Sequence, residues 1–238
     1  MSIPKILHQI WLGDNAPEQL LESWKSKYPD YEYKLWTEDN IPKEVVSQRK
    51  YQLTHNICQK VNILRYEILH EYGGFYVDSD TYCVKKLPSV YLNDYDFLAS
   101  YEYESGDVKV PNSDDAFKHF LEALVSNAYM ASVPGHPILK LLINTIKTMD
   151  EHYYTKEKSW LSSGPGLLTE ILKQYKAAVP ESKIHIFEKK YFNPFRLDNP
   201  LEKLSDSAIK EAYAIHFFSS TYKNYDLLHD VVSRVNAQ

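Results

Sequence analysis

The chain has 238 residues, a formal net charge of −5, and 44% hydrophobic and 25% charged residues. This composition is ordinary for a soluble globular protein, and the acidic balance argues against a general nucleic-acid binder. Cys58 and Cys83 are the only cysteines and lack metal-binding spacing, so neither a disulfide framework nor a zinc site is expected. We see no signal-peptide core and no apolar run of about 18 residues, and therefore expect a cytoplasmic protein.

Four predicted elements open the chain. Lys5–Trp11 is apolar enough for a central strand, and a helix is expected from Pro17 until just before Pro29. Tyr31–Trp36 alternates well enough to be a second strand. A strand, a helix and a strand in this order indicate the start of a parallel sheet of the nucleotide-binding type. A short helix is then expected from Pro42 to about Gln48.

A longer helix is predicted from about Asn56 to Tyr72. Its apolar residues lie four, three, four and four positions apart, which is the pattern of one buried stripe: Ile57, Val61, Leu64, Ile68 and Tyr72. Asn62 and Arg65 lie three positions apart and therefore share a face of this helix. From the pattern alone, these two polar residues are either a solvated flank or part of a site.

The central motif of the chain follows this helix. Gly73–Gly74 turns the chain, as glycine does at a helix C-terminus, and Phe75–Val77 has the pattern of a short buried strand. Asp78 and Asp80 come next, and residues two apart on an extended strand face the same way. Two close carboxylates repel, and a hard divalent ion with oxygen ligands is the simplest compensation. Two solvated turn acids are the alternative, but this context favours a metal site.

The middle of the chain contains two further predicted strands, Phe97–Ser100 and Asn127–Ser132. The polar stretch between them, Tyr101–Ser113, is expected to be a mobile loop. Loops of this length often act as functional lids, and plain disorder is the alternative. Asp114 is placed to cap a helix that continues through Val125.

Two helices are predicted next. Pro137 begins a clearly amphipathic helix that continues to about Met149. Ser162–Gly166 is a turn that leads into a helix over Leu167–Tyr175. Hydroxyls and amides at that helix N-terminus can hold an anion or a sugar, although the spacing alone fits an ordinary cap equally well.

The C-terminal part begins with a predicted strand, Ile184–Phe187, and a last strand, Ala212–Phe218, carries His216. One histidine in a strand is more often a satisfied core residue than a ligand. The apolar stripe from Leu227 to Val235 predicts a final helix that packs on the domain, because its polar side is not a basic membrane-binding face. We find no repeat, linker or low-complexity segment, and so expect a single domain over residues 1–238.

Taken together and in this order, these segments resemble glycosyltransferase family 32, the DXD sugar-binding family of α-1,6-mannosyltransferase-like enzymes and bacterial capsule transferases. The clostridial glucosylating toxins are distant relatives of that family. The matching segments extend over nearly the whole chain: Ile3–Ile6, His8–Gly13, Leu35–Trp36, Leu64–Tyr66, Ile68–Leu69, Tyr72–Asp80, Asn127–Ser132, Ser163–Pro165 and Ala214–His216. A lone D-x-D motif is a weak signal, whereas this ordered set is a strong one.

The resemblance implies a GT-A fold, which is a single α/β domain with a mixed, mainly parallel sheet flanked by helices. Residues about 1–100 would bind the nucleotide sugar, and residues about 101–238 would form the acceptor side and the closing C-terminal segment. It also implies a retaining transferase that uses Mn²⁺, with Mg²⁺ as the alternative, and a UDP- or GDP-hexose donor. The implied acceptor is a saccharide or a lipid-linked oligosaccharide in capsule or surface-polysaccharide synthesis, with at most peripheral association at the inner membrane face.

The family's functional positions map onto residues of this chain. Asp80 would ligate the metal directly, His216 matches the family's C-terminal metal position, and Asp78 would bind ribose or sugar and touch the metal through water. With Arg65, the two aspartates form the implied catalytic set. The implied donor-binding residues are Trp11, which would stack on the base, Arg65, which would contact the sugar, and Asn62, Tyr76, Asp78, Asn127, Ser163, Gly164, Thr221 and Tyr222.

Two positions depart from the family pattern. Asn62 stands where the family usually has aspartate, and it can still accept a hydrogen bond but adds no charge. Tyr222 stands where the family usually has a tryptophan beside the diphosphate.

Two other functions are consistent with the same motif. A haloacid-dehalogenase-like phosphatase also places D-x-D after a hydrophobic strand, but it needs threonine or valine where this chain has Tyr82. A non-catalytic sugar- or nucleotide-binding module descended from such a transferase is the other alternative, and Asn62 is the residue that favours it.

Overall fold

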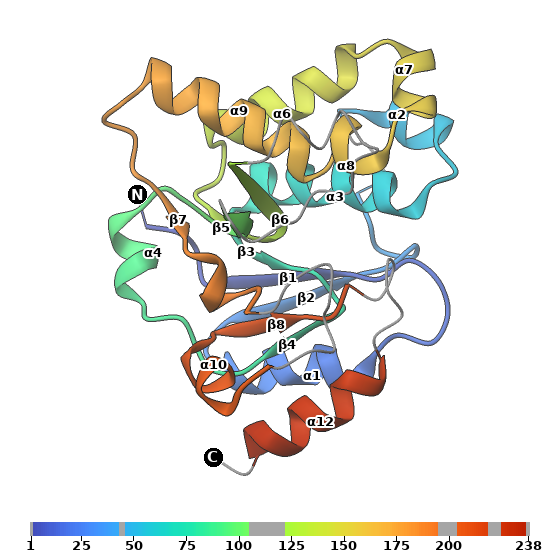
Figure 1. The fold of residues 1–238 in the computed structure, drawn as a ribbon. Coiled ribbons are helices and arrows are strands. Elements are labelled where there is room, and N and C mark those ends of the chain that lie inside the picture. Colours follow the sequence, from blue (N-terminus) through green and yellow to red (C-terminus); the bar gives the residue numbers. More distant parts are fainter. Residues whose placement is uncertain (1, 43–45, 105–121, 195–203, 219–224, 237–238) are drawn as a thin grey trace.

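The computed structural model describes residues 2–42, 46–104, 122–194, 204–218 and 225–236. Its centre is a six-stranded sheet in the order β2-β1-β3-β6-β5-β7 (Figure 1). The strands are β1 (Ile6–Ile10), β2 (Glu32–Trp36), β3 (Gly74–Val77), β5 (Phe97–Glu104), β6 (Ala123–Ser132) and β7 (Ile184–Phe187). Pairings β1–β2, β1–β3 and β5–β7 are parallel, and β6 is antiparallel to both of its neighbours. The predicted mixed, mainly parallel sheet is therefore confirmed.

Helices cover both faces of the sheet, because each strand alternates apolar side chains between two cores. On one face lie α3 (Ile57–Tyr72), α6 (Pro137–Thr148) and α9 (Pro165–Ala178), with the shorter α2 (Gln48–Leu53), α7 (Glu151–Lys156) and α8 (Ser159–Ser162) beside them (Figure 1). On the other face lie α1 (Glu18–Lys27), α10 (Asp206–Glu211) and α12 (Tyr225–Asn236) (Figure 1). Tyr76 of β3 belongs to the first core, whereas its neighbours Phe75 and Val77 belong to the second.

A second, two-stranded sheet pairs β4 (Thr81–Cys83) with β8 (Ala214–His216) in antiparallel fashion. Its register places Thr81 opposite His216, so the segment after β3 meets the C-terminal part of the chain. The last predicted strand thus exists, but it is shorter than expected and lies outside the main sheet. The C-terminal helix packs as predicted, with Val231 fully buried in a cluster that also contains Leu20 and Phe217.

The Gly73–Gly74 turn joins α3 to β3, and both glycines have positive φ angles, of 63° and 97°. A Cβ atom on Gly74 would lie 2.6 Å from the Ile6 carbonyl oxygen, so β1 can pair with β3 only because this residue is glycine. The buried His8 ring closes the same corner. Its Nδ1 accepts a hydrogen bond from Trp36 Nε1 at 3.1 Å, which leaves Nε2 to donate to the Gly73 carbonyl at 2.9 Å.

His8 makes the stability of this corner dependent on pH. Burial lowers its pKa from 6.5 to about 4, because the neutral ring suits the site and an imidazolium does not. Between these values the unfolded chain binds a proton that the folded chain does not, so stability is full above pH 6.5 and is lost as the pH falls towards 4. We expect this residue to lower the free energy of unfolding by about 3 kcal/mol over that interval.

Urea unfolding from pH 7 to pH 4 measures this effect. The fall in the free energy of unfolding between pH 7 and pH 4 should be smaller in His8→Gln than in the wild type. It should be unchanged in His55→Gln, which alters an exposed histidine. If the free energy of unfolding fell equally with pH in the wild type and in His8→Gln, the role given to His8 would be contradicted.

Three local predictions were wrong. The helix expected from Pro42 to Gln48 instead begins at Gln48, and residues 43–45 lie outside the described part of the chain. Tyr101–Glu104 extends β5 and is not loop, while residues 105–113 are not described. Ala123–Val125 opens β6 and is not the end of a helix, because these residues pair with the end of β5; residues 114–121 are not described.

The other predicted strands and helices are present close to their expected bounds. Among the described residues, the elements that the pattern did not reveal are six residues or shorter: β4, α7, α8, α10, α4 (Val90–Asp94) and the 3-10 helix η1 (Lys189–Tyr191). Within the described ranges, no helix is both long and apolar enough to cross a membrane.

Candidate active site

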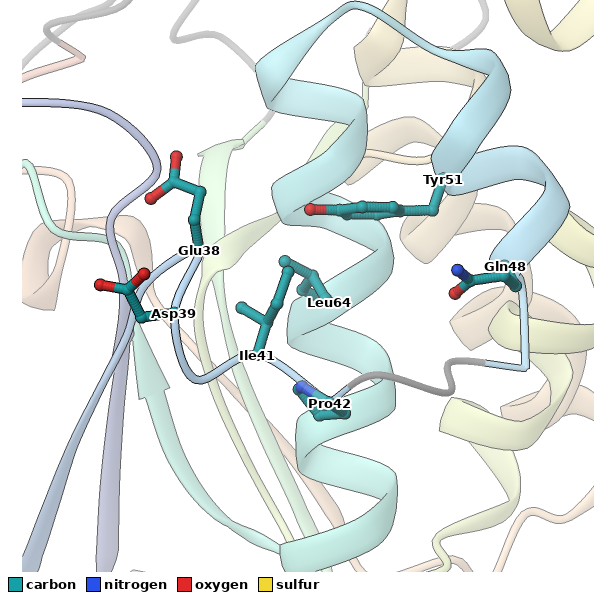
Figure 2. A pocket seen from close by; sticks show the side chains of 7 residues that line it. All are labelled: Glu38, Asp39, Ile41, Pro42, Gln48, Tyr51 and Leu64. Carbon is teal, nitrogen blue, oxygen red and sulfur yellow. The ribbon is translucent and has the colours of Figure 1, made fainter.

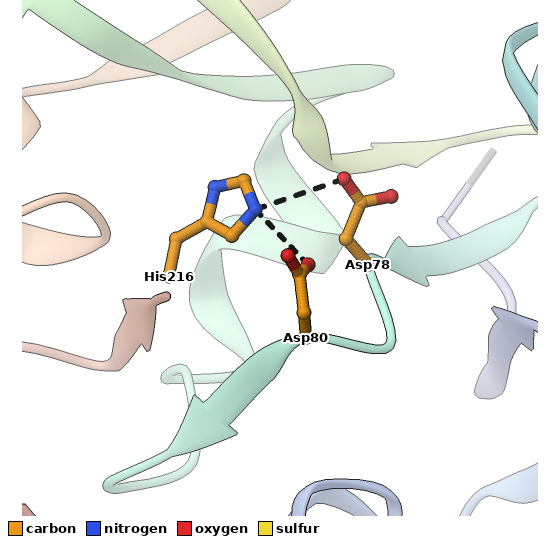
Figure 3. A group of neighbouring side chains, drawn as sticks. All are labelled: Asp78, Asp80 and His216. Carbon is orange, nitrogen blue, oxygen red and sulfur yellow. Dashed lines mark hydrogen bonds and ion pairs between the residues drawn. The ribbon is translucent and has the colours of Figure 1, made fainter. Parts of the chain in front are cut away.

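Asp78, Asp80 and His216 converge at the junction of the two sheets (Figure 3). The aspartates lie between β3 and β4, and His216 ends β8 on the facing strand. His216 Nε2 is 3.1 Å from Asp80 Oδ1 and 4.0 Å from Asp78 Oδ2. One ligand atom from each of the three side chains lies within 4.8 Å of the other two. The two predicted carboxylates therefore do share one site, and the histidine joins them.

Backbone and hydroxyl hydrogen bonds hold the aspartate turn in place. The Asp78 amide donates to the Ala128 carbonyl at 2.9 Å, so β6 fixes the first aspartate. The Asp80 carbonyl accepts from the Phe217 amide at 3.0 Å, so the segment after β8 fixes the second. Ser79 Oγ donates to the Ile10 carbonyl at 3.0 Å, which ties the turn to the end of β1.

The three side chains suit a divalent cation. In an octahedral shell with bonds of ~2.1 Å, two ligands at right angles lie about 3 Å apart, which matches the separation of His216 Nε2 and Asp80 Oδ1. Burial tends to lower the pKa of His216, but Asp80 and Asp78 outweigh it and raise that pKa above its ordinary value. The two carboxylates that favour a proton on the imidazole would equally favour a cation held between the three side chains.

Arg65 and Tyr76 orient Asp78. Arg65 Nη2 lies 3.0 Å from Asp78 Oδ1, and the Tyr76 hydroxyl donates to the same oxygen at 2.7 Å. The guanidinium also lies 4.7 Å from the centroid of the Tyr76 ring. Because Oδ1 is occupied by these two donors, Oδ2 is the oxygen that faces His216.

A chain of buried amides and hydroxyls lies behind Arg65. Arg65 Nη1 donates to the Asn127 carbonyl at 2.6 Å, and the Asn127 side-chain amide donates to Asn62 Oδ1 at 2.9 Å. Asn62 Nδ2 in turn donates to Ser163 Oγ at 3.1 Å. The exposed fractions of Asn62, Asn127 and Ser163 are 5%, 6% and 0%. Their expected contact with a donor stays a prediction, and what the structure shows is that they support Arg65.

Gly164 follows Ser163 and allows close packing of the turn between α8 and α9. A Cβ atom there would lie 2.7 Å from the Trp160 Cα atom, so a larger residue would push the turn away from α8. In the structure, Gly164 therefore lets the turn pack closely against α8. Its expected contact with a donor also stays a prediction.

A cavity of about 380 Å³ opens beside the three side chains. Six of the predicted site residues line it: Trp11, Arg65, Tyr76, Asp78, Asp80 and His216. The cavity has an acidic end at the aspartates and an apolar wall formed by α3 and the end of β1. Thr221 and Tyr222 lie outside the described residues.

Sequence reasoning missed seven lining residues: Ile10, Leu12, Ile57, Cys58, Val61, Ser79 and Phe218. Ile57 and Val61 had been assigned to a core stripe, yet they lie eight and four positions before Arg65 and so share its face of α3. This spacing was the available signal. Phe218, whose ring centroid is 3.8 Å from that of His216, is brought to the site only by the β4–β8 pairing.

A second hollow, of about 150 Å³, lies among the loop after β2, α2 and α3 (Figure 2). Its lining residues are Glu38, Asp39, Ile41, Pro42, Gln48, Tyr51 and Leu64. It is smaller than the first cavity, and its lining contains neither an arginine nor a histidine. We therefore assign the chemistry to the larger cavity.

Comparison with known proteins gives a consistent result. Residues 15–98 match the family described as "glycosyltransferase sugar-binding region containing DXD motif". Inositol phosphoceramide mannosyltransferase 2 of Schizosaccharomyces pombe is 30% identical over 192 residues, which are 75% of this chain and 48% of that protein. Mannosyl phosphorylinositol ceramide synthase SUR1 of Saccharomyces cerevisiae is 28% identical over 205 residues, which are 80% and 47% of the two chains. The chain thus spans about half the length of these curated relatives.

Solved structures agree on the fold. PaToxG glycosyltransferase superposes with a TM-score of 0.55 at 18% identity, covering 75% of this chain and 71% of that one. The UDP-bound glycosyltransferase domain of the YGT toxin superposes with a TM-score of 0.50 at 11% identity, and the match covers 97% of this chain and 89% of that domain. At such low identity these matches establish the fold alone, and that fold is the GT-A fold of glycosyltransferase domains.

Proposed function

We propose that the protein is a metal-dependent glycosyltransferase, because residues 15–98 match the family of DXD-containing glycosyltransferase sugar-binding regions. It moves a hexose from a nucleoside diphosphate to a hydroxyl group of a saccharide or glycolipid. The observation that carries this proposal is the position of Asp78, Asp80 and His216 at one end of a cavity whose opposite wall is apolar and aromatic. A cation ligand set and a base-binding surface in one cavity suit a nucleoside diphosphate.

Asp80, His216 and Asp78 would hold the cation. Bound there, a divalent cation supplies positive charge that offsets the negative charge developing on the leaving diphosphate. Imidazole is a ligand that suits transition metals better than it suits Mg²⁺, so His216 favours Mn²⁺. The two aspartate side chains are 19% and 18% exposed, so a cation can reach them without unfolding the site.

The remaining cavity residues are assigned to the parts of the donor that they would bind. Trp11, Leu12 and Val61 offer flat or apolar surface for the base. Arg65 lines the same cavity and contacts the cation ligand Asp78, where the sugar and diphosphate would reach. Either UDP or GDP suits such a surface, and the neighbour with UDP bound and the relatives named for mannosyl transfer leave both as candidates.

For the acceptor we propose a hydroxyl-rich head group, because one relative is named an inositol phosphoceramide mannosyltransferase and another a mannosyl phosphorylinositol ceramide synthase. A saccharide or lipid-linked oligosaccharide offers the same hydroxyl chemistry. Such acceptors would bring the protein to a membrane surface as a peripheral protein.

Turnover tests the proposal and separates it from the alternatives. The protein should release UDP or GDP from one of UDP-glucose, UDP-galactose and GDP-mannose in the presence of Mn²⁺, and release should stop on chelation. Nucleotide binding without any release would identify a binding module instead. Metal-dependent hydrolysis of p-nitrophenyl phosphate, with no release from nucleotide sugars, would identify a phosphatase.

Replacing Trp11 by alanine is expected to weaken nucleotide binding by on the order of 1–3 kcal/mol, because a stacking surface for the base is lost. Trp11→Phe keeps an aromatic ring and should recover most of the affinity. Calorimetric titration with UDP and GDP in the presence of Mn²⁺ measures both variants. Unchanged affinity in Trp11→Ala would remove this residue from the donor site.

A further inference from the structure

Thr81 lies where the aspartate turn meets the strand that faces His216. It is the first residue of β4 and follows Asp80 directly. In the pairing of β4 with β8, Thr81 lies opposite His216. Residues directly opposite each other in an antiparallel pair have Cα atoms about 5 Å apart. The backbone of Thr81 therefore sets the position of His216 relative to the two aspartates.

The Thr81 hydroxyl closes the turn that carries both aspartates. Its Oγ1 donates a hydrogen bond to the Asp78 carbonyl at 2.5 Å. A second bond orients this donor, because Trp24 Nε1 donates to the same Oγ1 at 2.9 Å. A hydroxyl has one proton, and here that proton points at the Asp78 carbonyl. Thr81 thus links α1, through Trp24, to the first aspartate.

Packing alone does not explain a hydroxyl at this position. Thr81 is fully buried, and burying a hydroxyl costs free energy unless it is hydrogen-bonded. Valine has nearly the same shape and would fill the space without a polar atom. Trp24 Nε1 also donates to the Thr81 carbonyl at 3.1 Å, so the indole would keep a partner beside a valine. The group that depends on the hydroxyl is the Asp78 carbonyl.

The direction of the Asp78 carbonyl matters for the spacing of the cation ligands. This carbonyl belongs to the planar peptide unit that joins Asp78 to Ser79, so its direction sets where Asp80 lies relative to Asp78. Without the bond from Thr81, this unit is free to rotate and to carry the Asp80 carboxylate away from His216 Nε2, which now lies 3.1 Å from it.

We propose that Thr81 is a positioning residue of the cation site, whose hydroxyl and backbone hold the aspartate turn and His216 at the spacing that a divalent cation needs. This inference rests on the proposed metal-dependent glycosyltransferase function. Thr81 does not line the donor cavity, and its hydroxyl proton is used by the Asp78 carbonyl. It therefore acts through Asp78 and not by contact with the donor.

Thr81→Val tests the role, because it keeps the shape of the side chain and removes the hydroxyl. Calorimetric titration of UDP and of GDP at a series of fixed Mn²⁺ concentrations gives the Mn²⁺ concentration at which nucleotide binding is half-maximal, without requiring turnover. We expect this concentration to rise about tenfold or more in Thr81→Val, as is usual when a hydrogen bond behind a metal ligand is lost. Thr81→Ser restores the hydroxyl and should stay within about threefold of the wild type.

The stability of the metal-free protein should change little. Thermal melting without Mn²⁺ should place Thr81→Val only about 2–4 °C below the wild type, which is the shift expected from one lost hydrogen bond in a chain of this size. A rise in the Mn²⁺ requirement with so small a shift separates positioning of the ligands from unfolding.

Thr169→Val is the matched control. Thr169 Oγ1 likewise accepts from an amide, that of Val125 at 2.9 Å, and donates to a carbonyl, that of Pro165 at 2.7 Å. Thr169 lies on α9 and does not line the donor cavity. This variant should show a similar fall in melting temperature and keep the wild-type Mn²⁺ requirement.

The outcomes separate the two proposals. An unchanged Mn²⁺ requirement in Thr81→Val, or an equal rise in Thr81→Ser or Thr169→Val, would overturn the role of Thr81 and leave the transferase function standing. A wild type that binds nucleotide with Mn²⁺ but releases none from nucleotide sugars would contradict the transferase function, while the comparison of variants would still decide the role of Thr81. A wild type that binds neither nucleotide with Mn²⁺ contradicts both.

Discussion

Asp80→Asn is expected to lower the release of nucleoside diphosphate from the preferred donor by about a hundredfold or more. The variant keeps the size of the side chain but loses the charge of the carboxylate that lies 3.1 Å from His216 Nε2. The cation would then lose one of its two anionic ligands, and the leaving diphosphate would lose charge that stabilises it. Steady-state release of UDP or GDP with saturating Mn²⁺ measures the effect.

The fold should survive this change, because the Asp80 side chain lies at the mouth of a cavity and not in a core. Asp30→Asn provides the control, since it makes the same substitution in an exposed pair with Lys5 and Lys86. Wild-type turnover in Asp80→Asn, alongside wild-type turnover in the control, would remove Asp80 from the site.

Gly74→Ala is expected to destabilise the protein by about 3 kcal/mol or more. The residue has a φ angle of 97°, and an added Cβ would lie 2.6 Å from the Ile6 carbonyl oxygen. That oxygen belongs to the backbone of β1, so relief of the clash requires β1 and β3 to separate. Urea unfolding at pH 7 gives the free energy of unfolding for both proteins.

Gly135→Ala separates steric clash from backbone strain. Gly135 also has a positive φ angle, of 70°, but nothing lies within 4 Å of the position its Cβ would take. We expect that variant to lose only about 1 kcal/mol, which is the cost of left-handed backbone for an L residue. If Gly74→Ala and Gly135→Ala lowered the free energy of unfolding equally, the contact with Ile6 would contribute nothing to the effect at Gly74.

The acidic motif could be predicted from sequence because its information is local. Two glycines, a short apolar strand and two aspartates two positions apart imply a turn, a buried strand and a shared direction for the carboxylates. The structure brings Asp78 and Asp80 to one site, but through the turn between β3 and β4 and not through the alternation of an extended strand. The paired strands of the main sheet were predictable for the same reason, since each carries its own apolar pattern.

His216 shows what local pattern cannot supply. It lies 136 positions after Asp80, and the two meet only because β4 pairs with β8. Each of those strands has three residues, too few for a periodic pattern to predict the pairing. The resemblance to a known family, and not the spacing of residues, pointed to this histidine as a ligand.

The apolar wall of the cavity shows a different limit. An apolar stripe on a helix indicates burial, but it does not say whether protein or ligand covers it. Val61 was therefore assigned to the core, although it lines the cavity. The buried chain from Asn62 to Ser163 was equally unpredictable, because each bond joins residues about 65 to 101 positions apart.

The central claim is that Asp80 and a divalent cation together bind a nucleoside diphosphate. Calorimetric titration of UDP and of GDP, each with and without Mn²⁺, on the wild type and Asp80→Asn tests it most directly. We predict that one nucleotide binds tightly to the wild type only when Mn²⁺ is present, and that Asp80→Asn abolishes this metal-dependent binding. Metal-dependent binding that is equal in both proteins, or absent for both nucleotides in the wild type, would contradict the account.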